Sequence, residues 1–89
     1  MLPRPHPSVV FQPVSDGAVL LQMEQETYYG LNGVGARIWQ LLPPECAEMD
    51  DLCTRLGESY PGVETETLRG DVVDLLMELE RNALVVAEA

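Results

Sequence analysis

A strand that runs directly into a helix limits most strongly how this chain can fold. The segment ETYYGLNGVGARIWQLL, residues 26–42, begins with the aromatic and β-branched residues of a strand and continues with apolar residues at helical spacing. Asn32 lies at the junction, where a side chain is needed to cap the helix. Pro43 and Pro44 end that helix. The chain therefore passes from a sheet to a helical layer within one short segment.

Two more strands are predicted before this junction. Residues 8–14 and 18–23 have the composition of strands, and the Ser-Asp-Gly sequence between them favours a hairpin turn. With residues 26–31 they form a three-stranded antiparallel meander whose last strand lies at an edge. Residues 1–7 contain three prolines and predict an extended, partly mobile N-terminal arm.

Three helices are predicted to follow the strands. The first, residues 33–42, directs four apolar side chains toward the core, and Trp39 lies to one side of this stripe. The second ends at Pro61 and the third at Asn82, before a short extended segment at residues 83–86. The candidate N-terminal caps are Asp50 or Asp51 for the second helix and Thr65 or Thr67 for the third. This order predicts one α+β domain over residues 1–89, arranged like a winged helix-turn-helix.

Composition favours a soluble globular protein of the cytoplasm. Hydrophobic residues make up 46% of the 89 residues, and the longest apolar runs are too short to span a bilayer. The N-terminus lacks the apolar segment of a secretory signal, so cytoplasmic localisation is expected. Cys46 and Cys53 lack CxxC spacing and are predicted to be reduced thiols, because disulfides are rare in the cytosol.

The charge of the chain argues against nucleic acid as a partner. Fifteen acidic residues stand against five basic ones, which gives a net charge of −10. The would-be recognition helix, residues 64–82, carries six acidic side chains and two arginines. Since phosphate contacts supply most non-specific DNA affinity, this helix would repel DNA. A peptide partner that carries basic residues remains compatible with the charge.

The sequence contains no pattern that indicates catalysis, a metal site or a cofactor. It has no Walker loop, no HExxH and no assignable Ser/His/Asp set. Gly30, Gly33 and Gly35 are spaced as GxxGxG rather than as the GxGxxG of dinucleotide sites. His6 is the only histidine, and its position in the proline-rich arm predicts a solvated surface residue. We therefore expect no enzymatic activity and no cofactor.

The third helix is predicted to present an apolar stripe beside an acidic flank. At about 100° per residue, the stripe that covers the core consists of Leu68, Val72, Leu75, Leu79 and Ala83, with Leu76 beside it. Asp71, Asp74 and Glu78 line one flank. Val73 and Met77 lie outside the stripe, where they form either a second patch for a partner or two scattered surface residues.

These features together predict a peptide-binding groove. An extended peptide can add as a fourth strand along the free edge formed by Glu26, Thr27, Tyr28, Tyr29 and Gly30. Side chains alternate along a strand, so Tyr28 and Tyr29 face opposite sides of the sheet, one inward with Leu31 and the other outward. The apolar floor of the groove is predicted to consist of Val72, Leu75 and Leu76, and its charged flank of Asp71, Asp74 and Glu78.

The order of YYGLN, GARIWQLL, DDLCTRLGESY and DVVDLLMELERNALV resembles that of the PqqD-like family, the recognition elements for ribosomally made and later modified peptides (RiPPs). The resemblance implies a non-catalytic domain that captures a leader peptide between its third strand and third helix. Leu75 departs from the family, in which an aromatic residue is frequent at this position.

Within that family, the size and acidity of the chain resemble the free-standing leader-binding proteins of split lasso-peptide systems. That resemblance implies three partners, namely the leader region of a precursor peptide, a transglutaminase-like cysteine leader peptidase and the macrocyclising enzyme. The first two helices, with Trp39 and the corner at Pro43 and Pro44, are the candidate docking surface for the peptidase. The alternatives are a peptide chaperone for a radical SAM enzyme in PQQ synthesis, or a structural or oligomerisation module.

Overall fold

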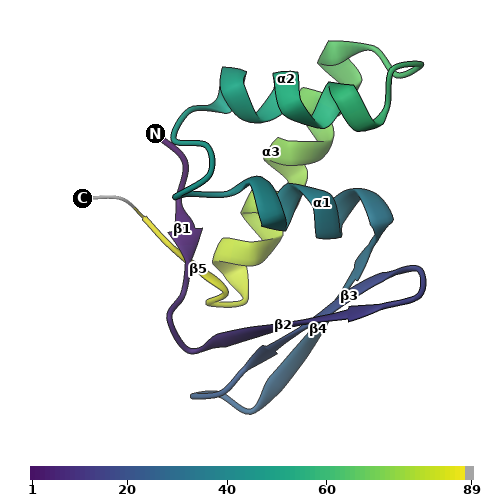
Figure 1. Cartoon of the computed structure of the whole chain (residues 1–89). Helices are drawn as coiled ribbons and strands as arrows, with labels where there is room; N and C mark the ends of the chain where they lie inside the picture. Colours follow the sequence, from purple (N-terminus) through teal and green to yellow (C-terminus); the bar gives the residue numbers. More distant parts are fainter. Residues whose placement is uncertain (88–89) are drawn as a thin grey trace.

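A three-stranded antiparallel sheet followed by three helices forms most of the computed structural model, which describes residues 1–87 (Figure 1). The elements in chain order are β1 (Arg4–Pro5), β2 (Val9–Val14), β3 (Gly17–Gln22), β4 (Thr27–Asn32), α1 (Gly33–Leu41), α2 (Met49–Ser59), α3 (Thr65–Arg81) and β5 (Val85–Val86). The predicted α+β class and the order of the sheet before the helices are confirmed. The predicted terminal strand is also present, as β5.

The sheet has the strand order β2-β3-β4, so β4 is an edge strand. Phe11, Leu20 and Tyr29 pair across the three strands in one row, and Val10, Leu21 and Tyr28 pair in the next. Leu20 is fully buried, whereas Tyr28 is exposed. The first row therefore faces the helices and the second faces away from them, as side-chain alternation requires.

Helix α1 covers the inner face of the sheet and lies between the sheet and α2 (Figure 1). Helix α3 packs against α2 and α1, and the chain after it returns to pair with β1. The largest fully buried side chains include Leu20 of β3 and, from the three helices, Ile38, Leu52, Leu56 and Leu79. One core thus joins the sheet to the helical layer.

The junction between β4 and α1 is formed as predicted. Asn32 is extended, and its Oδ1 accepts a hydrogen bond of 2.8 Å from the backbone N–H of Gly35. The side chain thereby satisfies one of the free N–H groups of the first helical turn. Strand and helix are joined without a loop, which fixes the direction in which α1 leaves the edge of the sheet.

The other two helices begin differently from the prediction. Glu48 precedes α2 and Glu64 precedes α3, and neither side chain makes a capping hydrogen bond. The predicted caps Asp50, Asp51, Thr65 and Thr67 all lie inside the helices. Asp50, Asp51 and Glu66 occupy first turns instead, where the positive end of the helix dipole favours a carboxylate.

The N-terminal arm, which was predicted to be extended and partly mobile, packs against the rest of the fold. Arg4 pairs with Val86 in an antiparallel two-stranded sheet of β1 and β5. Leu2 is 3% exposed, and its N–H donates to the carbonyl of Ala47 at 2.9 Å. Burial of one leucine and pairing with a distant strand fix a segment whose local composition indicates only an extended chain.

His6 is likewise held in place rather than solvated. Its Nδ1 accepts a hydrogen bond of 3.0 Å from the N–H of Ser8, and its Nε2 lies 3.3 Å from a carboxylate oxygen of Glu24. The histidine thus links the arm to the turn after β3.

Among the described residues, no helix is both long and apolar enough to cross a membrane.

Candidate functional site

The free edge of β4 presents unpaired backbone groups. The N–H of Met23, just after β3, donates to the carbonyl of Ser8 at 2.9 Å, so the odd-numbered residues of β3 direct their hydrogen bonds to β2. The even-numbered residues then bond to β4, and Leu20 pairs with Tyr29. Because bonding direction alternates along a strand, Tyr28 and Gly30 turn their N–H and C=O groups away from β3. These groups are available to an added strand.

The edge strand is shifted by one residue from the predicted strand, residues 26–31. Strand β4 begins at Thr27, and Glu26 lies in the preceding turn with a φ of 55°. That left-handed conformation is uncommon for a residue other than glycine and is found mostly in turns. Tyr29 is half-buried against the core, and Tyr28 is 75% exposed on the opposite face, so the two tyrosines face opposite sides as predicted.

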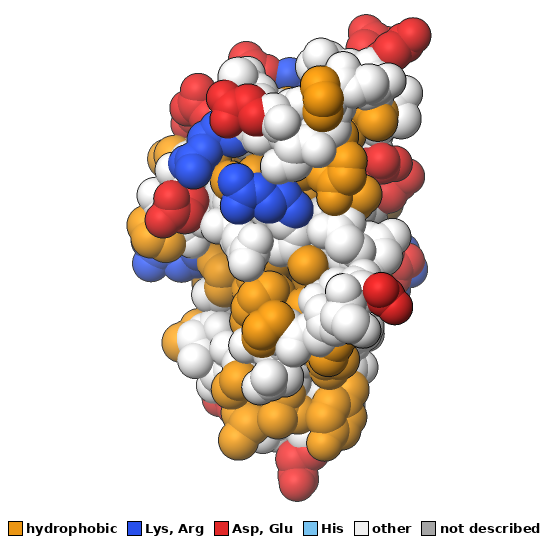
Figure 2. Space-filling model, turned by 45° about the vertical axis from the view of Figure 1, so that its right-hand side comes forward, with side chains coloured by type: hydrophobic (Ala, Val, Ile, Leu, Met, Phe, Trp, Pro, Cys, Tyr) orange, Lys and Arg blue, Asp and Glu red, His pale blue; other side chains and the backbone are white. Residues whose placement is uncertain are grey.

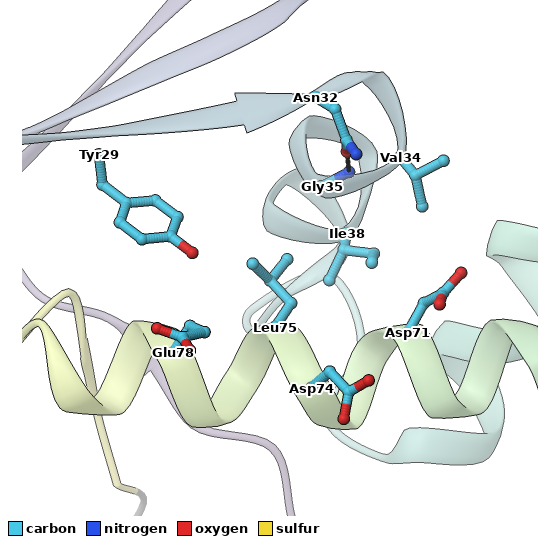
Figure 3. Close-up of a pocket in the computed structure, with 9 residues that line it drawn as sticks. All are labelled: Tyr29, Asn32, Val34, Gly35, Ile38, Asp71, Asp74, Leu75 and Glu78. Carbon is cyan, nitrogen blue, oxygen red and sulfur yellow. Dashed lines mark hydrogen bonds between the residues drawn. The ribbon is translucent and has the colours of Figure 1, made fainter.

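A pocket of about 330 Å³ lies between β4, the start of α1 and α3. Figure 3 shows its lining residues, with Tyr29 extending from β4 toward α3 and Leu75 rising from α3 toward Ile38. The lining residues are Tyr29, Asn32, Val34, Gly35, Ile38, Asp71, Asp74, Leu75 and Glu78. The structure therefore brings the edge strand and the acidic flank of α3 together, with apolar side chains between them.

The floor of this pocket differs from the predicted one. Leu75 is half-buried and lines it, but Val72 is 0% exposed and Leu76 is 8% exposed, and both belong to the core. Val72 and Leu76 do not line the pocket. Leu75 was predicted to lie in the core stripe and Leu76 beside it, but Leu76 is buried in the core and Leu75 is half-buried in the pocket.

Helix α1 supplies floor residues that the sequence assigned only to the core or to capping. Val34 and Ile38 line the pocket beside Leu75, and Asn32 and Gly35 form its wall at the start of α1. These residues reach the pocket because β4 runs directly into α1, which brings the first turns of the helix next to the edge strand. That junction was the signal that could have identified them.

Three carboxylates surround the opening of the pocket on the side of α3. Glu78 pairs with Arg81 at 2.9 Å, one turn further along the helix. Within residues 1–87, neither Asp71 nor Asp74 forms an ion pair, and both are exposed. The rim is therefore negatively charged, with two carboxylates that are free to bind a cation of a ligand.

Two other surfaces were predicted, the patch of Val73 and Met77 and the docking surface around Trp39. Val73 and Met77 are 41% and 56% exposed, so they lie outside the core as predicted. Trp39 is only 7% exposed and Pro43 is also buried, so these two residues pack in the core and cannot form the predicted docking surface. Trp39 belongs to the same buried cluster as Leu2 of the N-terminal arm and Leu52 of α2.

Both cysteines are withdrawn from solvent, whereas a reactive cysteine is partly exposed. Cys46 and Cys53 are both free thiols and both buried. Burial raises the pKa of the Cys53 thiol from its ordinary value; Arg69 opposes this shift and Asp50 adds to it. A raised pKa favours the neutral thiol, whereas a nucleophile requires the thiolate. Residues 1–87 contain no cluster of three or more His, Cys, Asp or Glu side chains arranged to hold a metal ion.

Comparison with known proteins places this geometry in a family. A family model described as coenzyme PQQ synthesis protein D (PqqD) matches residues 17–85. A solved structure described as TbiB1 in complex with the TbiA(beta) leader peptide is 30% identical, with a TM-score of 0.83 over 97% of this chain and 98% of that chain. A second, described as lasso peptide synthetase B1 complexed with the leader peptide, is 26% identical, with a TM-score of 0.82 over 97% of this chain and 99% of that chain. No curated protein sequence matches the chain significantly.

Proposed function

The chain belongs to the PqqD family, and from this premise we propose that it is a non-catalytic recognition element for the leader of a ribosomally made precursor peptide. A lasso-peptide precursor is the best candidate, because both similar structures are complexes with a leader peptide and one of them is a lasso peptide synthetase B1. The observation that carries the proposal is the free edge of β4, with its outward backbone groups, directly beside the pocket under α3.

In this proposal the leader binds as a fourth antiparallel strand. Its backbone pairs with the outward N–H and C=O groups of Tyr28 and Gly30, along the segment from Glu26 to Gly30. Every second side chain of the leader then points inward, toward Tyr29 and Leu75. Val72 and Leu76 support Leu75 from the core rather than contacting the leader. Backbone pairing provides affinity, and the pocket provides selectivity.

The negative charge of the rim favours a leader that carries a basic residue. The pocket floor accepts an apolar side chain, and Asp71, Asp74 and Glu78 stand where a neighbouring basic side chain would lie. A leader with an apolar residue next to an arginine or lysine therefore fits this site better than an acidic leader.

The test is a titration of the protein with the leader peptide of its own precursor, followed by amide hydrogen exchange of the complex. Saturable binding with new protection across residues 26–30 is expected. Protection that appears only elsewhere would exclude strand addition, and absence of binding would exclude the leader-binding function. A PQQ-type precursor peptide titrated in parallel distinguishes the lasso assignment from the role of a PQQ-synthesis chaperone.

We further propose that the protein presents the bound leader to a leader peptidase of the transglutaminase-like cysteine class, and afterwards to the macrocyclising enzyme. Its contribution is to raise the effective concentration of the precursor at the enzyme. In a reconstituted cleavage assay, leader removal should be slow without this protein and absent without the peptidase. Cleavage by this protein alone, or a peptidase rate that does not depend on it, would contradict the proposal.

A further inference from the structure

The face of the sheet that points away from the helices is largely apolar. Its side chains are Val10, Gln12, Val14, Val19, Leu21 and Tyr28, which alternate with the inward residues of the three strands. We call this surface the outer face. In an antiparallel sheet with one buried face, the other face normally carries polar residues that contact water. The polar residues of these outward rows are Gln12 and Asn32, and the side chain of Asn32 caps α1.

The apolar side chains of the outer face are accessible. Val10 is 46% exposed, Val14 is 51% exposed and Tyr28 is 75% exposed. Figure 2 shows hydrophobic side chains gathered over the lower part of the molecule, which the sheet occupies in Figure 1. A continuous exposed apolar surface of this kind marks a binding site for another macromolecule more often than a scattered surface residue does.

A hollow gives the outer face a place for an anchoring side chain. It measures about 290 Å³ and is lined by Leu21, Met23, Glu26 and Tyr28. Three of these side chains are apolar and the fourth is a carboxylate. Apolar side chains that enter such hollows dominate the energy of protein interfaces, and a neighbouring cation of the partner would pair with Glu26.

The charges around the outer face determine what kind of partner fits it. Residues 5–36, which include all three strands, contain no lysine or arginine. Asp16 lies in the turn between β2 and β3, and Glu24 and Glu26 lie in the turn between β3 and β4. Carboxylates therefore flank the apolar surface at both ends. Two copies of this face would bring these carboxylates together without a cation, in a chain of net charge −10.

We propose that the outer face is the docking surface for the leader peptidase, which would contact it with an apolar patch flanked by lysine or arginine. This inference rests on the function proposed above. The outer face and the leader pocket lie on opposite sides of the same sheet, so both can be occupied at once. A leader strand added to β4 would also direct every second side chain toward the outer face. The peptidase thereby contacts the protein and the bound leader on one continuous surface.

The experiment replaces apolar groups on β2, two strands away from the leader edge. The Val10→Thr/Val14→Thr variant keeps β-branched side chains and removes two apolar methyl groups from the outer face. The matched control is Val63→Thr, since Val63 is 41% exposed but lies between α2 and α3. Affinity for purified peptidase is measured with leader bound, and affinity for a labelled leader peptide is measured separately. We expect the double variant to bind peptidase about tenfold more weakly and to bind leader unchanged.

Each result has a defined meaning. Intact leader binding together with unchanged peptidase affinity in the double variant would overturn the docking proposal but leave the leader-binding function standing. If the wild-type protein does not bind the leader peptide, the proposed leader-binding function itself is refuted. A wild-type dimer in solution that Val10→Thr/Val14→Thr converts to a monomer would assign the face to self-association and overturn the proposal.

A charge variant provides a second test if the double variant is poorly folded. Asp16→Lys reverses one flanking charge in an exposed turn, and it should weaken peptidase binding at low salt and reduce the salt dependence of that binding. Peptidase affinity that is the same as wild type at every salt concentration would contradict the predicted charge of the partner.

Discussion

The side-chain amide of Gln22 donates a hydrogen bond of 2.7 Å to the backbone carbonyl of Ala83, which lies 61 residues further along the chain. Gln22 is 1% exposed, and its Oε1 also accepts a hydrogen bond of 2.9 Å from the N–H of Glu24. Ala83 follows α3 and has a φ of 58°. One buried side chain therefore connects the sheet and the turn before β4 to the end of α3. These segments adjoin β4 and α3, which line the candidate pocket.

Replacement of Gln22 should destabilise the protein. Gln22→Leu leaves the carbonyl of Ala83 and the N–H of Glu24 without their partner, which costs about 1–3 kcal/mol for a buried polar group. Urea unfolding followed by circular dichroism measures the loss. Gln40→Leu, at an exposed position of α1, is the control and should change stability by less than about 0.5 kcal/mol. Equal stability of the two variants would show that the link contributes little.

The cap at the start of α1 is a second local determinant of stability. Asn32→Ala removes the acceptor for the N–H of Gly35 and should lower the free energy of unfolding by about 1 kcal/mol. Asn32→Ser keeps an acceptor and should retain most of that stabilisation. Thermal unfolding of the three proteins provides the measurement. If the serine variant loses as much as the alanine variant, contacts of Asn32 other than the cap must be responsible.

Local sequence signals predicted the elements but not all of their partners. Alternation along β4, the cap at Asn32 and the prolines after α1 act within a few residues, so strand order and the first helix could be read directly. The pairing of β1 with β5 depends on contact between chain ends that are about 80 residues apart, for which two-residue strands carry no signal.

The site was predicted in part for a similar physical reason. The free edge and the acidic flank follow from periodicity, but the choice between Leu75 and Leu76 depends on how α3 rotates against α1 and α2. Gln22 was missed because one polar residue in an apolar strand indicates a buried hydrogen bond only when its distant partner is known. Trp39 was assigned to the surface because the covering segments come from elsewhere in the chain.

The carboxylates of the rim should control affinity for a basic leader. In Asp71→Asn/Asp74→Asn, two charges that lack ion pairs within the described residues are removed, and affinity for a basic leader should fall about threefold to tenfold at low salt. The salt dependence of binding should fall as well, since exposed charges are screened beyond about 8 Å at physiological ionic strength. Glu66→Gln/Glu80→Gln changes the net charge of α3 equally outside the pocket and is the control. Equal effects of both variants would indicate a general charge effect rather than recognition at the rim.

Stability should decrease at alkaline pH through Cys53. Its thiol titrates near 9.0 when unperturbed, and burial raises that pKa in the folded protein. The unfolded chain therefore releases this proton at lower pH than the folded one, so the contribution to stability is constant below about pH 9 and is lost as pH rises through the folded pKa. The free energy of unfolding of wild type and Cys53→Ala should converge as the pH rises above about 9. A constant difference would mean that the thiol is not protonated preferentially in the fold.

Gly30 provides the most selective test of strand addition. Its N–H points to the free edge, so Gly30→Pro removes a donor for the leader and places a ring at that edge without removing a bond to β3. Gly30→Ala keeps the N–H, and a Cβ at this position meets no atom within 4 Å. Leader affinity should fall about tenfold or more in the proline variant and stay near the wild-type value in the alanine variant. Thermal unfolding of both variants verifies that the sheet is intact. A folded proline variant that binds leader as tightly as wild type would rule out backbone pairing at Gly30, and the leader would then have to bind through the pocket side chains alone.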